Sequence, residues 1–174
     1  MALMRKGYVR QLLAGAVAAV FFLLPSCGEN GCYENRSSIP QAAFYAYNMP
    51  DRAIAIDSIE VYGVGHKTDS LLVEAASGTS SLYLPFRSDA DTTRYVIHYA
   101  SQALDDIANN DTLTFAYSRF PYFISGDCGV VFNYTITSFG YTRHLLDSAA
   151  LVNPEVTNRE AETIQLFYYV AIEE

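Results

Sequence analysis

The feature that most constrains the fold is a series of short apolar and aromatic segments, separated by turn residues at roughly ten-residue intervals. The chain has 174 residues, of which 14 are Tyr and 10 are Phe. No long helical pattern lies between the segments. Eight segments fit this description: 41–48, 53–65, 70–75, 81–86, 92–100, 112–124, 129–142 and 163–172, with 144–152 as an ambiguous ninth. We therefore predict an all-β fold, a single β-sandwich of eight or nine strands that is immunoglobulin-like or related.

Three of these regions predict local detail. In 53–65 the apolar positions change parity at Asp57-Ser58, which predicts a bulge or tight bend there. Residues 101–111 are the most helix-like part of the chain, and they predict no more than one turn. Segment 92–100 places three large side chains on one face of a strand: Tyr95, Ile97 and Tyr99.

The first 26 residues have the layout of a cleaved export signal. Three basic residues precede an unbroken small and apolar run from 12 to 24, and no acidic residue occurs before Glu29. A helix over this run would rise only ~20 Å, which is short of the ~30 Å hydrocarbon core of a bilayer. A cleaved signal over 1–26 is therefore expected, rather than a membrane span.

The sequence LPSC, which ends at Cys27, resembles the lipobox of bacterial lipoproteins. The resemblance implies that the Cys27 thiol receives a diacylglycerol, that the signal is cut before Cys27, and that the new amine is acylated. Several acyl chains, at about 0.8 kcal/mol per buried CH₂, would hold the protein stably in a lipid bilayer. The alternative is an uncleaved signal anchor with an incidental cysteine.

Acylation of Cys27 would leave Cys32 and Cys128 as the remaining cysteines. Disulfides persist outside the cytoplasm, and two cysteines permit one intramolecular pairing, so we predict a Cys32–Cys128 disulfide. The alternatives are two buried free thiols, or a metal site that would need further ligands. The expected organisation is a signal peptide over 1–26, a lipidated tether over 27–40 and one β-sandwich domain over 41–174.

The charge balance argues against nucleic acid as a partner. The chain has a formal net charge of −8 at pH 7, and the expected mature part has eight basic and 19 acidic residues, a net charge of −11. Such a surface repels nucleic acid and anionic lipid, and it favours cations or basic surfaces.

No pattern in the sequence selects a catalytic or metal-binding residue. The three histidines, His66, His98 and His144, do not lie at a metal-ligand spacing, and none of the familiar hydrolase or phosphate-binding motifs occurs. Two acidic loops, 88–93 and 105–111, offer oxygen ligands of the kind that calcium uses, but solvated turns explain them better. We therefore expect no enzyme activity, no metal and no cofactor.

A short motif recurs five times, in which Asp is followed by Ser or Thr and then by a small, apolar or Thr residue. From composition alone, roughly 0.6 matches are expected for a motif this short. The pattern resembles the acceptor motif for general protein O-glycosylation of exported proteins in Bacteroidota. A turn that leads into a strand explains the same pattern, and the glycosylation and turn interpretations can both be correct. The resemblance implies five acceptor hydroxyls: Ser58, Ser70, Thr92, Thr112 and Ser148.

Four stretches together resemble small lipoproteins of Bacteroidota that are known only as a domain of unknown function: LPSC, GCYENRSS, IDSIEVYGVG and FPYFISGDCGVVFNY. The resemblance implies no catalytic residue. We expect a membrane-anchored envelope lipoprotein that binds an envelope protein or a glycan, or takes part in envelope assembly. A spacer without a ligand is the alternative, and an enzyme or a calcium-binding domain is a weaker one. Because Gly28 follows Cys27, we expect the outer membrane, with the periplasmic face favoured over the cell surface.

Overall fold

The computed structural model describes residues 32, 34–64 and 70–171. The chain divides into two units, Met1–Cys32 and Tyr33–Glu174, and the elements of secondary structure described below lie in the second. In the part that the structure describes, they are eleven strands and one short 3-10 helix. In chain order these are β1 (Gln41–Ala46), β2 (Met49–Ala53), β3 (Ile59–Val64), β4 (Ser70–Ala76), β5 (Ser81–Tyr83), β6 (Thr92–Tyr99), η1 (Ile107–Asn109), β7 (Asp111–Ser125), β8 (Gly129–Tyr141), β9 (Ser148–Leu151), β10 (Glu155–Val156) and β11 (Glu162–Tyr168).

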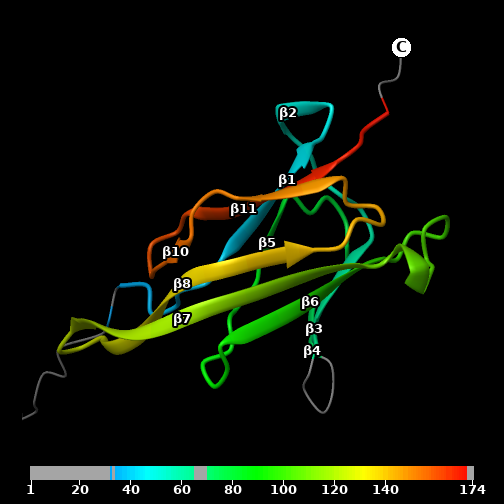
Figure 1. Ribbon diagram of the computed structural model, residues 1–174. Helices are drawn as coiled ribbons and strands as arrows, with labels where there is room; N and C mark the ends of the chain where they lie inside the picture. Colours follow the sequence, from blue (N-terminus) through cyan, green and yellow to red (C-terminus); the bar gives the residue numbers. More distant parts are fainter. Residues whose placement is uncertain (1–31, 33, 65–69, 172–174) are drawn as a thin grey trace, which may run out of the picture. The chain divides into compact units, whose positions relative to one another are not determined.

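The strands form two sheets, which Figure 1 shows as two layers. One sheet has the order β2-β1-β11-β9, and β5 also pairs with β1. The other has the order β10-β8-β7-β6-β3-β4. β1 and β11 pair in parallel, so the first and last strands of the domain lie side by side. The described part of the chain is therefore all-β, as predicted.

One cluster of buried side chains joins the two sheets. Phe44 of the first sheet and Ile97 and Phe115 of the second are fully buried in it. Phe86, which follows β5, stacks on Tyr117 of β7 with 4.2 Å between the ring centroids. Aromatic residues thus fill the space between two half-buried sheets, and the arrangement is β-sandwich-like.

The predicted number of eight or nine strands is wrong, because eleven are found among the described residues. The two additional strands lie in segments that the sequence marks as turn and loop. β2 contains Pro50 and pairs with the end of β1, while the two residues of β10 pair with β8. Neither segment has an apolar alternation of its own, so each becomes a strand only through its neighbour. The ambiguous segment 144–152 contains β9.

The local predictions are confirmed. Ser58 has a φ of +54°, a left-handed conformation that bends the chain directly before β3. The helix-like segment 101–111 forms the single 3-10 turn η1. The three residues predicted to share one face of β6 are all buried in the core: Tyr95, Ile97 and Tyr99.

The predicted signal peptide over 1–26 and the predicted acylation site Cys27 lie outside the described residues. Among the residues that are described, no helix is long and apolar enough to cross a membrane.

Candidate functional site

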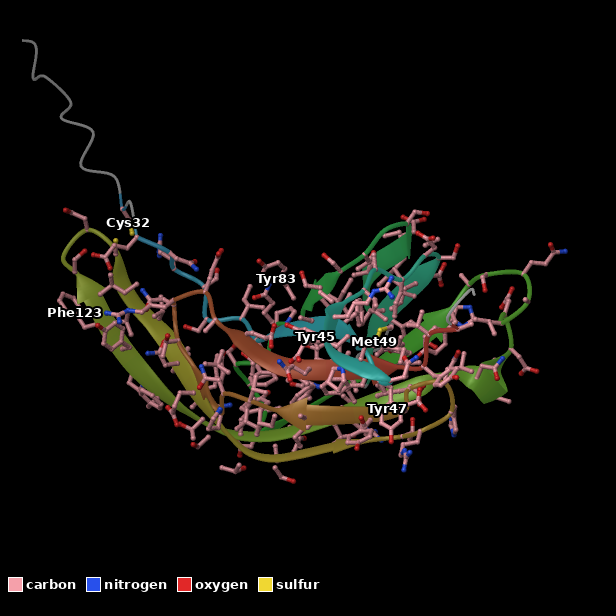
Figure 2. The ribbon with its side chains drawn as sticks, turned by 90° about the horizontal axis from the view of Figure 1, so that it is seen from above. Cys32, Tyr45, Tyr47, Met49, Tyr83 and Phe123 are labelled. Atoms are coloured by element: carbon pink, nitrogen blue, oxygen red, sulfur yellow. The ribbon has the colours of Figure 1, made fainter. Side chains whose placement is uncertain are left out.

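The first candidate site is the outer end of the β7–β8 hairpin, here called the arm and defined as residues 118–133. β6 pairs with β7 only as far as Ala116, so among the described strands the arm is a ladder of β7 and β8 alone. Several of its apolar side chains are uncovered: Phe123 is 63% exposed, Val130 56% and Phe132 44%. Figure 2 shows Phe123 at the end of these two strands. The arm therefore carries aromatic strand residues that face solvent.

Four apolar residues of the arm share one face of the ladder. Residues directly opposite each other in an antiparallel pair point to the same side. Phe123 lies opposite Val130, and Pro121 lies opposite Phe132. These four residues are here called the apolar arm face, and all of them are exposed. They form one contiguous apolar surface rather than scattered exposed side chains.

The predicted disulfide between Cys32 and Cys128 is confirmed. Cys128 lies in the turn of the arm, where its N–H donates to Ser125 Oγ at 3.1 Å, and its side chain is buried. Further along the tether, Ser38 Oγ donates to Asn133 Oδ1 at 2.8 Å. Cys32 is thus joined covalently to the tip of the arm.

The second candidate site is a hollow of about 460 Å³, here called the distal hollow, near the opposite end of β7. Its lining is mainly aliphatic and aromatic, with two carboxylates, Asp57 and Asp147. Asp57 accepts from the N–H of Gly78 at 2.6 Å, and Asp147 accepts from the N–H of Tyr169 at 2.5 Å. Tyr169 is 68% exposed. The lining residues are Ile54, Ala55, Ile56, Asp57, Tyr99, Leu104, Leu145, Asp147, Tyr168, Tyr169 and Val170.

Asp111, the first residue of β7, supports the wall of the distal hollow. Its side chain is fully buried, and no cation accompanies it among its hydrogen-bond partners in the described structure. The partners are the N–H groups of His144, Leu145 and Leu146 at 2.8, 3.0 and 2.8 Å, Thr142 Oγ1 at 2.9 Å and the Tyr99 hydroxyl at 3.0 Å. The carboxylate therefore organises the loop between β8 and β9, which brings Leu145 to the hollow.

Two tyrosines of the distal hollow are held in their neutral form. The Tyr99 hydroxyl lies 3.0 Å from the Tyr168 hydroxyl oxygen, and both rings are buried. Burial raises the pKa of both phenols above the ordinary value. Because both phenols stay protonated near neutral pH, they add no charge to the hollow. The acidic side chains of its lining are Asp57 and Asp147.

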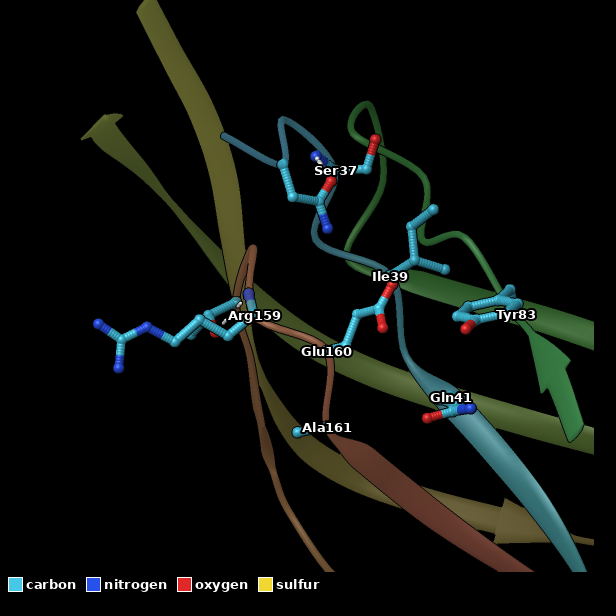
Figure 3. A pocket seen from close by; sticks show the side chains of 9 residues that line it. Ser37, Ile39, Gln41, Tyr83, Arg159, Glu160 and Ala161 are labelled. Atoms are coloured by element: carbon cyan, nitrogen blue, oxygen red, sulfur yellow. Dashed lines mark hydrogen bonds between the residues drawn. The ribbon is translucent and has the colours of Figure 1, made fainter. Parts of the chain in front are cut away.

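A third hollow, of about 190 Å³, lies where the described part of the tether meets the domain (Figure 3). Asn158 Nδ2 donates to the backbone oxygen of Asn35 at 3.1 Å, which attaches the tether beside this hollow. In Figure 3 the side chain of Arg159 points away from the other lining residues. The tether thus forms one wall of this hollow. The lining residues are Asn35, Ser37, Ile39, Gln41, Tyr83, Thr157, Arg159, Glu160 and Ala161.

The acidic loops considered for calcium have other partners. Arg87 contacts Asp89 at 3.0 Å, and Asp106 Oδ1 accepts from the N–H of Ala108, which caps η1. His98 Nε2 lies 3.3 Å from Asp105 Oδ1. Within the described residues, no group of three or more His, Cys, Asp or Glu side chains could hold a metal ion. His66 lies outside those residues.

The five predicted glycosylation positions all lie at the beginning of a strand. They are Ser58 directly before β3, Ser70 at the start of β4, Thr92 at the start of β6, Thr112 as the second residue of β7 and Ser148 at the start of β9. In three motifs the aspartate accepts backbone N–H groups: Asp57, Asp111 and Asp147. This geometry supports the interpretation of the motif as a turn that leads into a strand.

Glycosylation itself stays a prediction, and the structure ranks the positions. Thr92 is exposed, whereas Thr112 is half-buried and accompanies the fully buried Asp111. A glycosyltransferase needs an accessible hydroxyl, so we expect a glycan on Thr92 and none on Thr112. Mass spectrometry of glycopeptides from the exported protein checks this, and a modified Thr112 beside an unmodified Thr92 would contradict it.

Reasoning from the sequence missed both the apolar arm face and the distal hollow. A signal for the arm does exist in the segment lengths. β7 has 15 residues and β8 has 13, whereas the neighbouring β6 has only 8. Strands this much longer than their neighbour must extend beyond it. The distal hollow leaves no comparable signal, because its lining comes from several separate segments of the chain.

Comparison with known proteins gives one match. Residues 58–168 match a family of unknown function, DUF6452, and this range runs from the bend before β3 to the end of β11. No curated protein and no solved structure matches the chain significantly. Because the match covers more than half of the sequence, the chain belongs to the DUF6452 family of unknown function.

Proposed function

We propose that this protein is an exported lipoprotein of the kind found in Bacteroidota, anchored through acylated Cys27, whose β domain binds another envelope protein. The observation that carries the proposal is the Cys32–Cys128 disulfide. Disulfides persist in oxidising compartments, and this one begins five residues after the cysteine of the lipobox. An export signal, a lipid-attachment cysteine and a disulfide thus all support a location outside the cytoplasm.

The disulfide also supports an orientation of the domain. It ties the segment after Cys27 to the turn that follows β7, whereas the distal hollow lies near Asp111 at the start of that strand. A strand of this length spans roughly 45 Å at ~3.3 Å per residue. An anchor at Cys27 would therefore hold the arm near the bilayer and present the distal hollow to the envelope space.

The lining of the distal hollow favours an apolar segment of a protein, flanked by basic residues. Its accessible and half-buried lining is mostly aliphatic, and Tyr169 adds one open aromatic ring. Asp57, Asp147 and the negative net charge of the chain complement basic groups. A glycan is the alternative ligand, and a spacer that binds nothing is the second alternative. The two buried phenols offer no general base near neutral pH, because burial raises their pKa.

Replacing Cys27 with serine should abolish lipid attachment. Serine lacks the thiol that receives the diacylglycerol, so signal cleavage should stop as well, or yield a soluble product. Metabolic labelling with a fatty-acid analogue measures this directly. The Cys32→Ser variant is the matched control, because it keeps the lipobox and should be labelled like the wild type. Equal labelling of the wild type and Cys27→Ser would contradict the proposed anchor.

The proposed location is the periplasmic face of the outer membrane. The residue after Cys27 is Gly28 rather than an aspartate, and the tether has no acidic run of the kind associated with surface display. Cell fractionation and protease treatment of intact cells distinguish the locations. Loss of the domain without lysis would place it on the cell surface instead.

A photo-crosslinking amino acid in place of Tyr169 should form an adduct with one envelope protein in living cells. The exposed ring of Tyr169 borders the distal hollow, so a bound partner lies within reach. Adding Leu104→Lys, which places a cation in the apolar lining, should remove the adduct. Ile107→Lys is the matched control, because Ile107 is exposed and close in sequence but does not line the hollow.

The alternatives give different results in the same experiment. An adduct that carries glycan and no protein would favour the glycan ligand. No adduct from position 169 would favour the spacer role. An adduct that forms equally from position 83, on β5, would show contact that is not specific to the distal hollow.

A further inference from the structure

We propose that the apolar arm face docks on the lipid bilayer in which Cys27 is anchored, inserting its side chains at the level of the headgroups. The proposal rests on the proposed anchor at Cys27. It adds a second, non-covalent contact with the membrane, made by Pro121, Phe123, Val130 and Phe132.

The composition of the arm fits a membrane interface. Between Phe120 and Phe132 the chain carries a single charged side chain, Asp127, although its overall net charge is −8. Phe123 and Val130, both more than half exposed, lie directly opposite each other next to the turn. An apolar tip with one charged side chain, on an otherwise acidic domain, meets less repulsion from lipid than the rest of the surface would.

The backbone of the arm is suited to the same environment. The two strands pair from Ser118 opposite Thr135 to Ser125 opposite Gly129, so their inward-facing N–H and C=O groups are satisfied within the arm. In the turn, the N–H of Cys128 donates to Ser125 Oγ. Unpaired backbone groups are costly to bring into hydrocarbon, so the outward-facing groups on the two edges of the arm should stay in the hydrated headgroup region while the apolar side chains insert.

The covalent connection brings the arm within reach of lipid. Cys27 and Cys32 are five residues apart, so their Cα atoms are separated by at most ~17 Å. Cys32 is bonded to Cys128, which lies two residues from Val130. A group tethered this closely meets the bilayer at a high effective concentration, whereas a protein partner would have to reach the arm by diffusion. The bilayer is therefore the occupant that the connectivity favours.

A single tryptophan provides the test, because the chain contains none. The full-length lipidated protein carrying Phe123→Trp is reconstituted into phosphatidylcholine vesicles, with and without acyl chains that carry bromine. Tyr169→Trp is the matched control, since Tyr169 is as exposed as Phe123 but lies at the distal hollow. We expect the emission of Trp at 123 to shift to shorter wavelength and to lose most of its intensity with brominated lipid. The emission of Trp at 169 should do neither.

The outcomes separate the arm from the anchor. If the protein floats with the vesicles and Trp at 123 is neither shifted nor quenched, the arm does not dock and only the anchor stands. If the protein does not float, the anchor fails and the docking proposal fails with it. If Trp at 123 is shielded only in native membranes, and not in vesicles of lipid alone, the arm binds a protein and the proposal is overturned.

Discussion

Replacing Asp111 with alanine should lower the free energy of unfolding by about 4 kcal/mol, because it leaves several buried donors without an acceptor. Three of these donors are backbone N–H groups of the loop between β8 and β9, including that of the buried Leu146. An unsatisfied buried polar group costs about 1–3 kcal/mol, and rearrangement of the loop recovers part of this. Urea unfolding, followed by circular dichroism, measures the change.

Two variants control this experiment. Asp111→Asn keeps one side-chain oxygen and should lose about half as much stability as Asp111→Ala, roughly 2 kcal/mol. Asp57→Ala removes an exposed carboxylate that accepts from the N–H of Gly78, and it should cost no more than about 1 kcal/mol. If Asp111→Ala is no less stable than Asp57→Ala, the buried carboxylate does not organise the loop as described.

Much of the fold can be predicted because its strands have recognisable patterns in a few consecutive residues. The alternation through Tyr95, Ile97 and Tyr99 comes from the pleat of a single strand, and all three side chains are buried as predicted. The parity change at Asp57-Ser58 is equally local, and the left-handed Ser58 accounts for it. Signals of this kind need only a few consecutive residues.

Features that depend on distant residues could not be predicted in the same way. Asp111 belongs to one of five similar motifs in the sequence, and only the loop more than thirty residues later distinguishes it. The parallel pairing of β1 with β11 joins the two ends of the domain and leaves no local trace. The apolar arm face has the same alternation of apolar residues as a core strand. Its exposure could not be predicted, because the sequence does not show where the opposite sheet ends.

The same difference between local and distant signals applies to the candidate sites. The disulfide between Cys32 and Cys128 followed from a count of cysteines and from the expected export. The distal hollow could not be predicted from the sequence, because it combines the segment before Asp57, the loop that contains Leu104 and the residues after β11. Each of these segments by itself looks like an ordinary connection.

Removing the Cys32–Cys128 disulfide should lower the free energy of unfolding by about 4–5 kcal/mol in the chain-entropy model, because the bridge closes a loop of about 96 residues. The Cys27→Ser protein is the background for this measurement, since it contains no thiol besides these two. Adding Cys32→Ser and Cys128→Ser should lower the midpoint of urea unfolding. A reductant should bring the background protein to the same midpoint and leave the double variant unchanged. An unaltered midpoint in reductant would contradict the prediction.

The same bridge should keep the domain attached to the membrane after the tether is cut. Arg36 is exposed and lies between Cys32 and β1, so trypsin can cleave after it. In the lipidated protein on vesicles, the cleaved domain should stay bound, because Cys128 is still joined to the anchored segment through Cys32. Addition of a reductant should then release most of the domain into solution, because the small apolar arm face is too weak an anchor to hold it by itself. The Arg36→Gln variant is the control, since it loses this cleavage site and should stay bound under both conditions. Release of the cleaved wild-type domain without reductant would show that the bridge does not connect the anchor to the arm.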